Sequence, residues 1–325
     1  MIKPVKFLIL RFSSIGDIVL TTPVIRCLKQ QYPNAEIHYY TKKKFGFLLE
    51  DNPYVDKLWL LDNSSDNSLN LLSKENFDYI IDLHTNLRTL KIKLKLGKPS
   101  FSFEKLNIQK FLLTNFKINY LPDLHIVDRY LATLKSFGVQ NDNLGLDYFI
   151  PFKDQVENDW LPATHGSGFV AYAIGGQHFT KKLPVPRIIE LCSKINHPVI
   201  LLGGKEDFDE GETVRLALGD SQIFNACGKY NFNQSASIIE KAKIVFSHDT
   251  GLMHVAAAFN KRIYSIWGNT IPAFGMYPYK TSFEIIENNN LNCRPCSKIG
   301  YNKCPRKHFR CMNDLSFNFD IKELM

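Results

Sequence analysis

Short apolar runs with strand-like composition alternate with helical patterns along most of the chain, and this alternation restricts the possible folds more than any other feature. In the first half, the strand-like runs are residues 6–11, 36–40, 57–61 and 79–83. A strand, a helix and a second strand in this order form a βαβ unit, whose two strands pair in parallel. The first half is therefore predicted to be a parallel sheet with helices on both faces.

A second series of the same kind begins near Gly168. Its strand-like runs are residues 169–174, 198–202, 244–246 and 261–266. A chain of 325 residues is long enough for two domains of about 150 residues each. The polar stretch 153–168 is the best candidate for the linker between them. We predict two similar α/β halves, with ligands bound at the carboxyl ends of the strands in a cleft between the halves.

Three segments have patterns that do not indicate a single helix or strand directly. Residues 17–31 are expected to form one helix that is interrupted at Thr22 and Pro23, and residues 62–70 are expected to form a polar loop. Residues 87–97 fit a strand, because lysines alternate with apolar residues, and also a helix, because leucines recur at helical spacing. A helix is favoured because the run follows a strand in a βαβ series, and its lysines would then form a basic, solvated flank.

The composition is that of a globular protein with an anionic partner. The apolar fraction is 45% and the formal net charge is +8. No run approaches the ~20 apolar residues of a membrane span, and the first residues lack the features of a signal peptide, so a cytoplasmic location is expected. Nucleic acid, acidic lipid surfaces and phosphorylated sugars would all suit the positive charge, and solubility alone explains it equally well.

The segment 247–254 has the pattern of an anion-binding turn. It follows an apolar run, and Asp249, Thr250 and Gly251 open an alanine-rich helix. The first turn of a helix has unpaired N–H groups and the positive end of the helix dipole, which together favour phosphate. Gly251 would let a ligand approach the backbone. His254 is kept as a further ligand contact, although a histidine on such a helix more often serves packing.

A second glycine-marked turn follows the first strand and carries a carboxylate. Ser14 is a candidate helix cap, Gly16 allows a tight turn, and Asp17 falls at the start of the helix. An acid in the first turn of a helix is often only a favourable charge. At the carboxyl edge of a sheet, Asp17 is also placed to act as a general base in the cleft.

Two turns in the second half have residues that suit a nucleoside diphosphate. Thr180, Lys181 and Lys182 follow a strand that ends in two glycines, and lysines there would neutralise phosphate charge. Glu206 follows another glycine pair and would accept hydrogen bonds from ribose hydroxyls. Taken alone, the lysine turn is equally consistent with an ordinary basic loop. The Glu206 turn, taken alone, is more consistent with an acidic helix start.

These motifs occur together in an order that resembles the heptosyltransferases, which transfer heptose from ADP-heptose to the inner core of lipopolysaccharide. The resemblance runs from about residue 6 to residue 312. The matching elements are the segments 7–17 and 21–23, 82–84 with 86–88, 180–184, 203–206, 249–257, and 267–268 with Thr270. The resemblance implies a fold of the GT-B type with two Rossmann-like domains, at residues 1–157 for the acceptor and 158–325 for the nucleotide sugar. The last residues are expected to pack back on the first domain.

The resemblance also implies a reaction and roles for single residues. The reaction would be an inverting transfer of heptose that requires no metal and no cofactor. Asp17 would be the catalytic base and Lys181 the phosphate-neutralising lysine, with Lys182 competing for that role. Glu206 would contact the ribose. The other residues expected at the donor are Ser14, Gly16, Thr180, Asp249, Thr250, Gly251 and His254, while His84 and Arg88 are expected to contact the acceptor.

Four cysteines cluster near the end of the chain. Cys293, Cys296, Cys304 and Cys311 have the spacing C-x₂-C-x₇-C-x₆-C, with His308 among them. This spacing is similar to that of a small zinc site. Disulfides are unfavourable in a reducing cytosol, and free thiols packed in a surface loop are the preferred alternative.

The expected partners follow from this interpretation. They are a nucleotide-sugar donor and an anionic lipid-linked saccharide, with peripheral contact at the inner face of the cytoplasmic membrane. One alternative is transfer of another nucleotide-activated sugar. A second is a nucleotide-sugar epimerase or dehydrogenase, but no G-x-G-x-x-G follows the first strand. A third is a nucleic-acid binder, which is not expected because the basic residues are not interleaved with aromatic ones.

Overall fold

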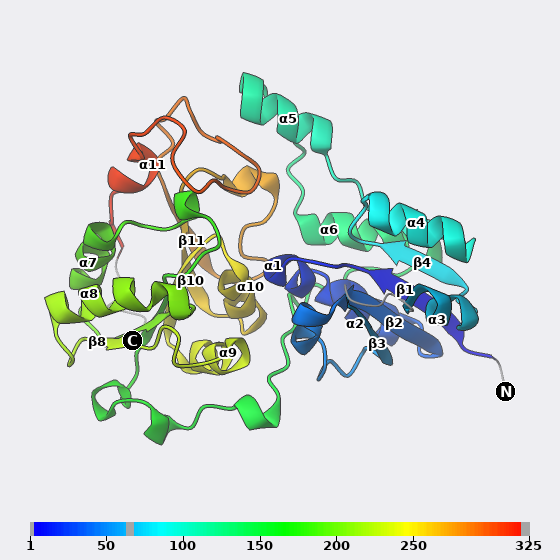
Figure 1. The fold of residues 1–325 in the computed structure, drawn as a ribbon, viewed down its shortest axis with the longest axis horizontal. Helices are drawn as coiled ribbons and strands as arrows, with labels where there is room; N and C mark the ends of the chain where they lie inside the picture. The colour runs from blue at the N-terminus through cyan, green and yellow to red at the C-terminus, as the bar shows by residue number, and fades with distance from the viewer. Residues whose placement is uncertain (1–2, 63–67, 320–325) are drawn as a thin grey trace. The chain divides into compact units, whose positions relative to one another are not determined.

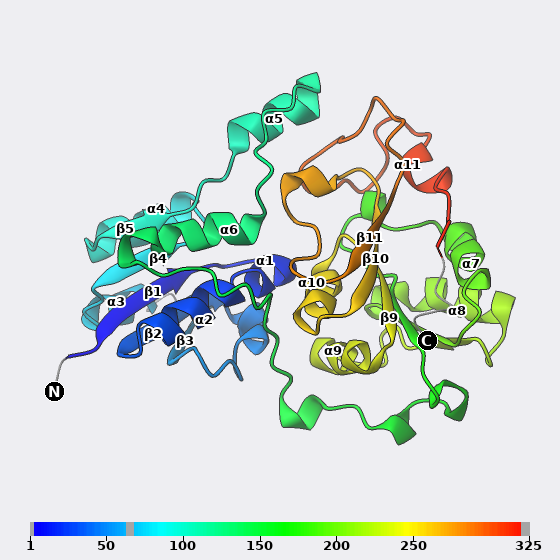
Figure 2. The same cartoon turned by 180° about the vertical axis from the view of Figure 1, so that it is seen from behind.

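The computed structural model describes residues 3–62 and 68–319, and its internal contacts divide the chain into two compact units (Figures 1 and 2). Unit 1 consists of Met1–Lys105 and Leu124–Phe149, and unit 2 consists of Leu106–Asp123 and Ile150–Met325. The chain therefore leaves unit 1 after Lys105, forms part of unit 2, and returns at Leu124. Within the described residues, no helix is long and apolar enough to cross a membrane.

Unit 1 is a parallel sheet of five strands in the order β3-β2-β1-β4-β5. The strands are β1 (Val5–Leu10), β2 (Ala35–Lys42), β3 (Lys57–Leu61), β4 (Tyr79–Asp82) and β5 (Ser100–Ser102). The helices of this unit are α1 (Ile15–Val19), α2 (Thr22–Gln31), α3 (Ser68–Lys74), α4 (Leu87–Leu96) and α6 (Ile126–Leu131). The predicted parallel sheet is confirmed, and the strand orders of both units fit βαβ connections.

The central strand β1 is apolar along most of its length because both faces of the sheet are covered. Leu8 and Leu10 lie in one cluster of buried side chains with Tyr40 of β2 and Ile80 of β4. This is the pattern expected for parallel strands, which cannot leave one face to solvent. The turn after Leu10 therefore starts from a fully buried strand end.

Unit 2 is a parallel sheet of six strands in the order β11-β10-β9-β6-β7-β8. The strands are β6 (Val170–Ala173), β7 (Val199–Leu202), β8 (Ile223–Asn225), β9 (Ile244–His248), β10 (Arg262–Trp267) and β11 (Phe283–Glu287). The helices are α5 (Asn107–Phe116), α7 (Val185–Ser193), α8 (Phe208–Leu218), α9 (Phe232–Lys241), α10 (Gly251–Ala258) and α11 (Arg310–Asn313). The strand β9 is central, and α10 starts directly after the turn at its end.

Some local predictions differ from the structure. The single helix expected at residues 17–31 is two helices, α1 and α2, and Pro23 lies in the first turn of α2, where its missing N–H is not needed. The expected loop at residues 62–70 contains the start of α3, and residues 63–67 of it lie outside the described residues. Sequence reasoning also missed the strands β5, β8 and β11, and β5 and β8 have only three residues each.

Residues 87–97 form the favoured helix, and its solvated side carries leucines as well as the predicted lysines. Asn86 caps α4 by accepting a hydrogen bond from the N–H of Thr89 at 2.9 Å, and Gly97 ends it at a φ of 60°. Leu87 and Leu94 are 79% and 74% exposed. The leucines therefore share the solvated side with the lysines, and the helix packs through the buried Thr89 and Ile92.

Residues 309–319 pack on unit 2, and the expectation that the last residues return to the first domain stays a prediction. Phe309, Met312, Leu315 and Phe317 are buried in the same apolar cluster as the strands of the unit 2 sheet. Residues 320–325 lie outside the described residues. Burial of these side chains makes the last described turn part of the unit 2 core.

The stretch 153–168, expected as a linker, is attached to unit 2 by buried polar contacts. The Asp154 carboxylate accepts hydrogen bonds from the side-chain amides of Asn231 and Asn233 at 2.8 and 3.0 Å. The N–H of Val156 donates to the hydroxyl of Ser237 at 2.9 Å. These contacts fix the path of residues 153–156 along α9.

A buried arginine holds α2 against residues 142–147, and its removal is expected to destabilise unit 1. Arg26 is 3% exposed, bonds the Asp142 carboxylate with two nitrogens at 2.7 and 2.9 Å, and also pairs with Asp147. Arg26→Ala leaves both carboxylates without their cation, so we expect a loss of roughly 3–5 kcal/mol in the free energy of unfolding. Urea denaturation measures this free energy.

The control is Arg310→Ala, which removes an exposed ion pair with Asp314 and should lower the free energy of unfolding by under about 1 kcal/mol. Equal losses of unfolding free energy in the two variants would contradict the prediction.

Candidate functional site

The turn after β1 fixes a carboxylate at the carboxyl edge of the unit 1 sheet. Ser14 is the N-cap residue of α1, and the Asp17 carboxylate accepts hydrogen bonds from the Ser14 backbone N–H and hydroxyl at 2.9 and 2.7 Å. Its second oxygen lies 2.7 Å from a guanidinium nitrogen of Arg11, and its side chain is 21% exposed. Gly16 is buried below it. Asp17 is therefore held in one orientation while part of it remains open to a ligand.

The charge of Asp17 is stabilised by its surroundings. Burial acts to raise the pKa of Asp17. The Arg11 guanidinium and the two Ser14 donors lower this pKa by more than burial raises it, so it lies below the ordinary value of a carboxyl group. The side chain is therefore an anion at neutral pH. An ionised carboxylate beside a partly open surface is in the state that a general base requires.

Arg11 organises this turn, and sequence reasoning gave it no role. The side chain is 7% exposed and donates hydrogen bonds to the carbonyls of Ser13 at 2.7 Å and Leu83 at 2.5 Å. It also donates to the Tyr130 hydroxyl at 3.0 Å. Arg11 thus joins the turns after β1 and β4, which explains how Asp17 and the segment around His84 reach the same part of unit 1.

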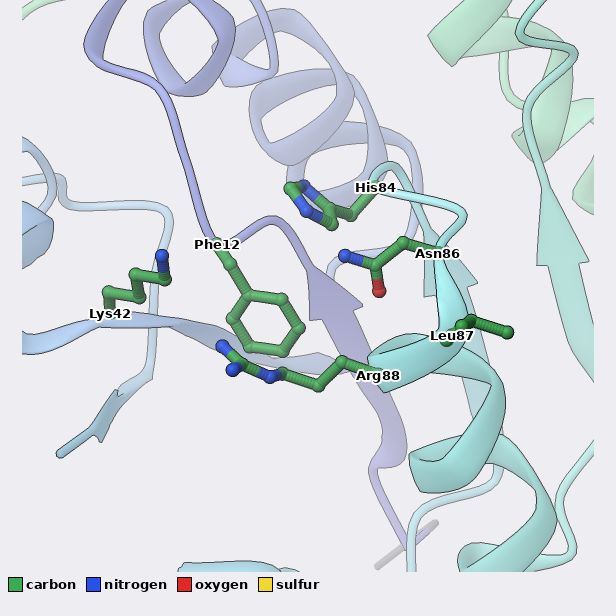
Figure 3. A pocket seen from close by; sticks show the side chains of 6 residues that line it. All are labelled: Phe12, Lys42, His84, Asn86, Leu87 and Arg88. Carbon is green, nitrogen blue, oxygen red and sulfur yellow. The ribbon is translucent and has the colours of Figure 1, made fainter. Parts of the chain in front are cut away.

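A pocket of about 410 Å³ lies beside this turn (Figure 3). Its lining residues are Phe12, Lys42, His84, Asn86, Leu87 and Arg88. The Phe12 ring lies at its centre, with the Arg88 guanidinium 5.7 Å from the ring centre and Lys42 on another side. Two cationic side chains around one cavity favour an anionic ligand. Of these residues, only His84 and Arg88 were expected, and Lys42 was missed because it lies on another strand.

His84 is held neutral in this pocket. The N–H groups of His84 and Thr85 donate to the buried Asp82 carboxylate at 3.1 and 2.7 Å, which shapes the turn after β4. Burial and the positive charges of Arg11 and Lys105 lower the pKa of His84 to about 4. Its buried Nδ1 has no hydrogen-bond partner in the described structure. A neutral imidazole with an unused ring nitrogen is suited to hydrogen-bond a hydroxyl.

In unit 2 the predicted anion turn connects β9 to α10. Thr250 is the N-cap residue of α10 and Gly251 its first residue. Lys181 reaches this turn, because its Nζ lies 2.6 Å from an Asp249 carboxylate oxygen and 3.1 Å from the Asp249 carbonyl oxygen. The same carboxylate oxygen accepts a hydrogen bond from the Thr270 hydroxyl at 2.9 Å. Lys181, Asp249, Thr250 and Gly251 are therefore brought together as expected.

Lys182 lies in a different environment. Its Nζ is 2.7 Å from a carboxylate oxygen of Asp207 and 2.7 Å from one of Glu210. Burial acts to lower the pKa of Lys182, but the two carboxylates raise it overall. Both acids lie at or near the start of α8. The Lys182 ammonium thus attaches the 179–182 turn to α8. Which of the two lysines neutralises phosphate stays a prediction.

Two other predicted donor residues have clear positions. Thr180 is 1% exposed, and its hydroxyl both donates to the carbonyl and accepts from the N–H of Tyr301, at 3.1 and 2.8 Å. It fixes the 295–303 loop on the lysine turn. Glu206 is exposed beside Gly204. A second cavity, of about 300 Å³, involves residues on either side of Glu206 in the sequence. It is lined by Lys205, Phe208, Asp209, Cys227, Gly228 and Lys229.

The histidines near the anion turn are buried. His254 lies inside α10 and is 2% exposed. His248 accepts a hydrogen bond from the N–H of Leu183 at 3.1 Å, and burial lowers its pKa to about 3. The His248 ring therefore holds the turn before α7 against β9 in its neutral form.

Arg294, which lies between Cys293 and Pro295, is buried in unit 2. Arg294 is 8% exposed, donates to the carbonyls of Gly268 and Thr270 at 2.5 and 3.0 Å, and pairs with Glu287 at 2.8 Å. It therefore holds the segment that carries Thr270, which in turn bonds Asp249.

The four cysteines lie in one loop region as free thiols. The Cys293 sulfur is 3.9 Å from His308 Nε2, and the Cys296 thiol donates to the Cys293 carbonyl at 3.1 Å. Burial raises the pKa of Cys296 to about 11 and that of Cys311 to about 12, so these thiols stay protonated at neutral pH. Zinc would have to displace these thiol protons on binding, and the zinc site suggested by the cysteine spacing stays a prediction.

Within residues 3–62 and 68–319, three potential metal-ligand atoms lie within 4.8 Å of one another only at Glu36, His38 and Glu75. There, the indole N–H of Trp59 donates to His38 Nδ1 at 3.0 Å, so Nε2 carries the proton and donates to Glu36 at 2.7 Å. Lys6 pairs with both carboxylates. The group is an ion-pair cluster rather than a metal site.

Comparison with known proteins adds an independent finding. The model of glycosyltransferase family 9 (heptosyltransferase) matches residues 69–305. The chain is 24% identical over 295 residues to lipopolysaccharide heptosyltransferase 1 of Campylobacter coli, covering 82% of this chain and 84% of that protein. It is 30% identical over 295 residues to lipopolysaccharide heptosyltransferase 2 of Escherichia coli (strain K12), covering 83% and 84%. The solved structure of E. coli ADP-heptose lps heptosyltransferase II has a similar fold, with a TM-score of 0.69 and 19% identity over 95% of this chain and 98% of that one.

Proposed function

The chain belongs to glycosyltransferase family 9 and is a glycosyltransferase, and from this premise we propose that it transfers heptose from ADP-heptose to the inner core of a lipopolysaccharide. Its two α/β units with parallel sheets have the predicted GT-B type of fold. The donor is proposed because the similar proteins are heptosyltransferases and one is named for ADP-heptose. The acceptor is an anionic, lipid-linked saccharide for the same reason.

Unit 2 is proposed to bind the donor. The diphosphate would lie at the Asp249–Gly251 turn, where the first N–H groups of α10 and the Lys181 ammonium supply positive charge. Glu206 is proposed to accept hydrogen bonds from the ribose. The cavity next to it includes the Phe208 ring, which is 39% exposed and offers a flat apolar surface for the base.

Unit 1 is proposed to bind the acceptor. The pocket around Phe12 carries the Lys42 and Arg88 cations, which would hold carboxylate or phosphate groups of the inner core. Asp17 is proposed to take the proton of the attacking hydroxyl, and the neutral His84 to orient that hydroxyl. Arg11 and Ser14 would keep Asp17 in place during the reaction.

The proposed reaction is an inverting displacement at the anomeric carbon. The acceptor oxygen attacks that carbon, the bond to the diphosphate breaks, and the proton of the hydroxyl passes to Asp17. Negative charge then develops on the leaving ADP. Lys181 and the α10 N–H groups would stabilise it, so the proposed mechanism uses no metal and no cofactor.

The observation that carries this proposal is the presence of a fixed, ionised carboxylate in unit 1 and a lysine-bearing anion turn in unit 2 within a family 9 chain. We expect ADP release when the protein is incubated with ADP-heptose and heptose-free lipopolysaccharide, measured by a coupled ADP assay. UDP-glucose and ADP-glucose serve as competing donors. Faster release from either than from ADP-heptose would contradict the proposed donor, and no release from any of them with any saccharide acceptor would contradict the reaction.

A further inference from the structure

One segment of unit 2 has several large apolar side chains exposed to solvent. In residues 106–123, which contain α5, Ile108 is 73% exposed, Phe111 52%, Phe116 62% and Tyr120 68%. The rings of Phe111 and Phe116 lie edge to face with their centres 6.0 Å apart. Contiguous exposed apolar side chains of this size mark an interaction surface.

The exposed face of α5 is set by how the opposite face packs. Leu113 is buried, and the Lys110 ammonium lies 6.0 Å from the centre of the Phe274 ring of unit 2. These contacts turn Ile108 and Phe111, which are three residues apart on the helix, toward solvent. The exposure is thus a consequence of a fixed helix orientation.

The end of α5 adjoins a strongly basic loop. The Lys117 ammonium, directly after the helix, donates to the carbonyls of Cys293 and Pro295 at 3.2 and 2.7 Å. Both views of the ribbon show α5 and the loop before α11 toward the same end of unit 2 (Figures 1 and 2). The apolar segment and the loop are therefore neighbours in one surface.

The charge of this loop has one sign. Residues 288–313 contain no aspartate or glutamate, and they include exposed cations. The exposed cations are Lys298, Lys303, Arg306, Lys307 and Arg310. Residues 105–122 likewise contain lysines but no acid. We call residues 106–122 together with 298–310 the α5 surface.

We propose that the α5 surface docks unit 2 on an anionic lipid bilayer, with the α5 side chains inserted between headgroups and the basic loop against lipid phosphates. The apolar side chains supply the insertion energy and the cations supply attraction to anionic lipid, a combination typical of interfacial helices. The inference rests on the proposed function, in which the acceptor is anchored in a membrane. Docking raises the local concentration of that acceptor at the enzyme.

Vesicle binding tests the surface directly. The full chain is mixed with vesicles of phosphatidylethanolamine and phosphatidylglycerol, or of phosphatidylcholine alone, and the bound fraction is measured by flotation. We expect binding to the anionic vesicles that is reduced by at least about tenfold in phosphatidylcholine and falls with salt. Absence of binding to the anionic vesicles would overturn the proposal.

Variants separate the two components. One double variant, Phe111→Ser with Phe116→Ser, removes the exposed rings. The other, Arg306→Glu with Lys307→Glu, reverses two loop charges. Each double variant should bind anionic vesicles at least about tenfold more weakly than the natural chain. Phe152→Ser is the matched control, because Phe152 is 95% exposed in unit 2 but outside the α5 surface, and it should bind like the natural chain. Equal binding of all variants, or an equal loss in the control, would contradict the proposal.

Transfer to a deacylated, water-soluble acceptor distinguishes this proposal from the proposed function. The same variants should keep the activity of the natural chain with that acceptor, since none of their positions lies in the donor or acceptor sites. Loss of activity there would contradict the proposal, because it would assign these side chains to the fold or the sites and not to a docking surface. Vesicle binding without transfer by the natural chain would contradict the proposed function and leave the α5 surface supported.

Discussion

Asp17→Asn is expected to lower kcat by about 10²–10⁴-fold while the affinity for ADP stays nearly unchanged. The amide keeps the shape of the side chain and can still bond Ser14, but it cannot take a proton from the acceptor hydroxyl. Initial rates with ADP-heptose give kcat, and calorimetric titration with ADP gives the affinity.

The control for this prediction is an acid with the same local position and no proposed role. Asp128 lies in the first turn of α6, also in unit 1. Asp128→Asn should leave kcat within about threefold of the natural chain, because a first-turn acid contributes mainly helix stability. If Asp17→Asn behaves like Asp128→Asn, Asp17 is only a helix-start residue and the proposed base is wrong.

The pH dependence of transfer should reflect the environment of Asp17. Its pKa is lowered, so the carboxylate stays ionised as the pH falls through the usual titration range of aspartate, near 3.9. A group with a lowered pKa loses its charge only below that range, so no loss of kcat from this residue is expected between about pH 5 and 7. An acidic limb with a midpoint near pH 6 would indicate a different base.

Lys181→Ala is expected to lower kcat by about 10²–10³-fold and to weaken ADP binding. Its ammonium lies at the Asp249 turn, where charge develops on the leaving diphosphate in the proposed mechanism. After the substitution, Asp249 keeps its hydrogen bond from Thr270, so the turn itself should remain folded. Rates with ADP-heptose and titration with ADP measure the two effects.

Lys182→Ala is the matched comparison, because the two lysines are adjacent and similar in exposure. Lys182 pairs with Asp207 and Glu210, so its loss should lower the melting temperature of the protein. The kcat of Lys182→Ala should stay closer to that of the natural chain than the kcat of Lys181→Ala. If Lys182→Ala reduces kcat and ADP binding as strongly as Lys181→Ala, the assignment of the diphosphate to Lys181 is contradicted.

Much of the fold could be predicted because its signals are local. The alternation of strand and helix patterns gave both parallel sheets, since strands covered on two faces must be apolar along their length. The glycine-marked turns after β1 and β9 were found at the ends of these strands. The order of the short motifs gave the family, which the family match confirms.

The remainder depends on contacts between residues far apart in the chain. Arg11 bonds the Leu83 carbonyl 72 residues away, and Lys42 joins His84 and Arg88 in one pocket from a different strand. No periodicity records such pairs. The different carboxylate partners of the adjacent Lys181 and Lys182 likewise come from distant parts of the chain.

Contacts between distant residues also decide which helix faces are exposed to solvent. In α4 and α5 the sequence shows leucine, isoleucine and phenylalanine at helical spacing, and local rules bury such residues. The tertiary structure instead leaves Leu94 and Phe111 exposed, because Ile92 and Leu113 occupy the packed faces. The sequence by itself determined the family and most of the longer helices and strands, because those signals are local. Only the packing of those segments decided which side chains meet at the candidate sites and which face solvent.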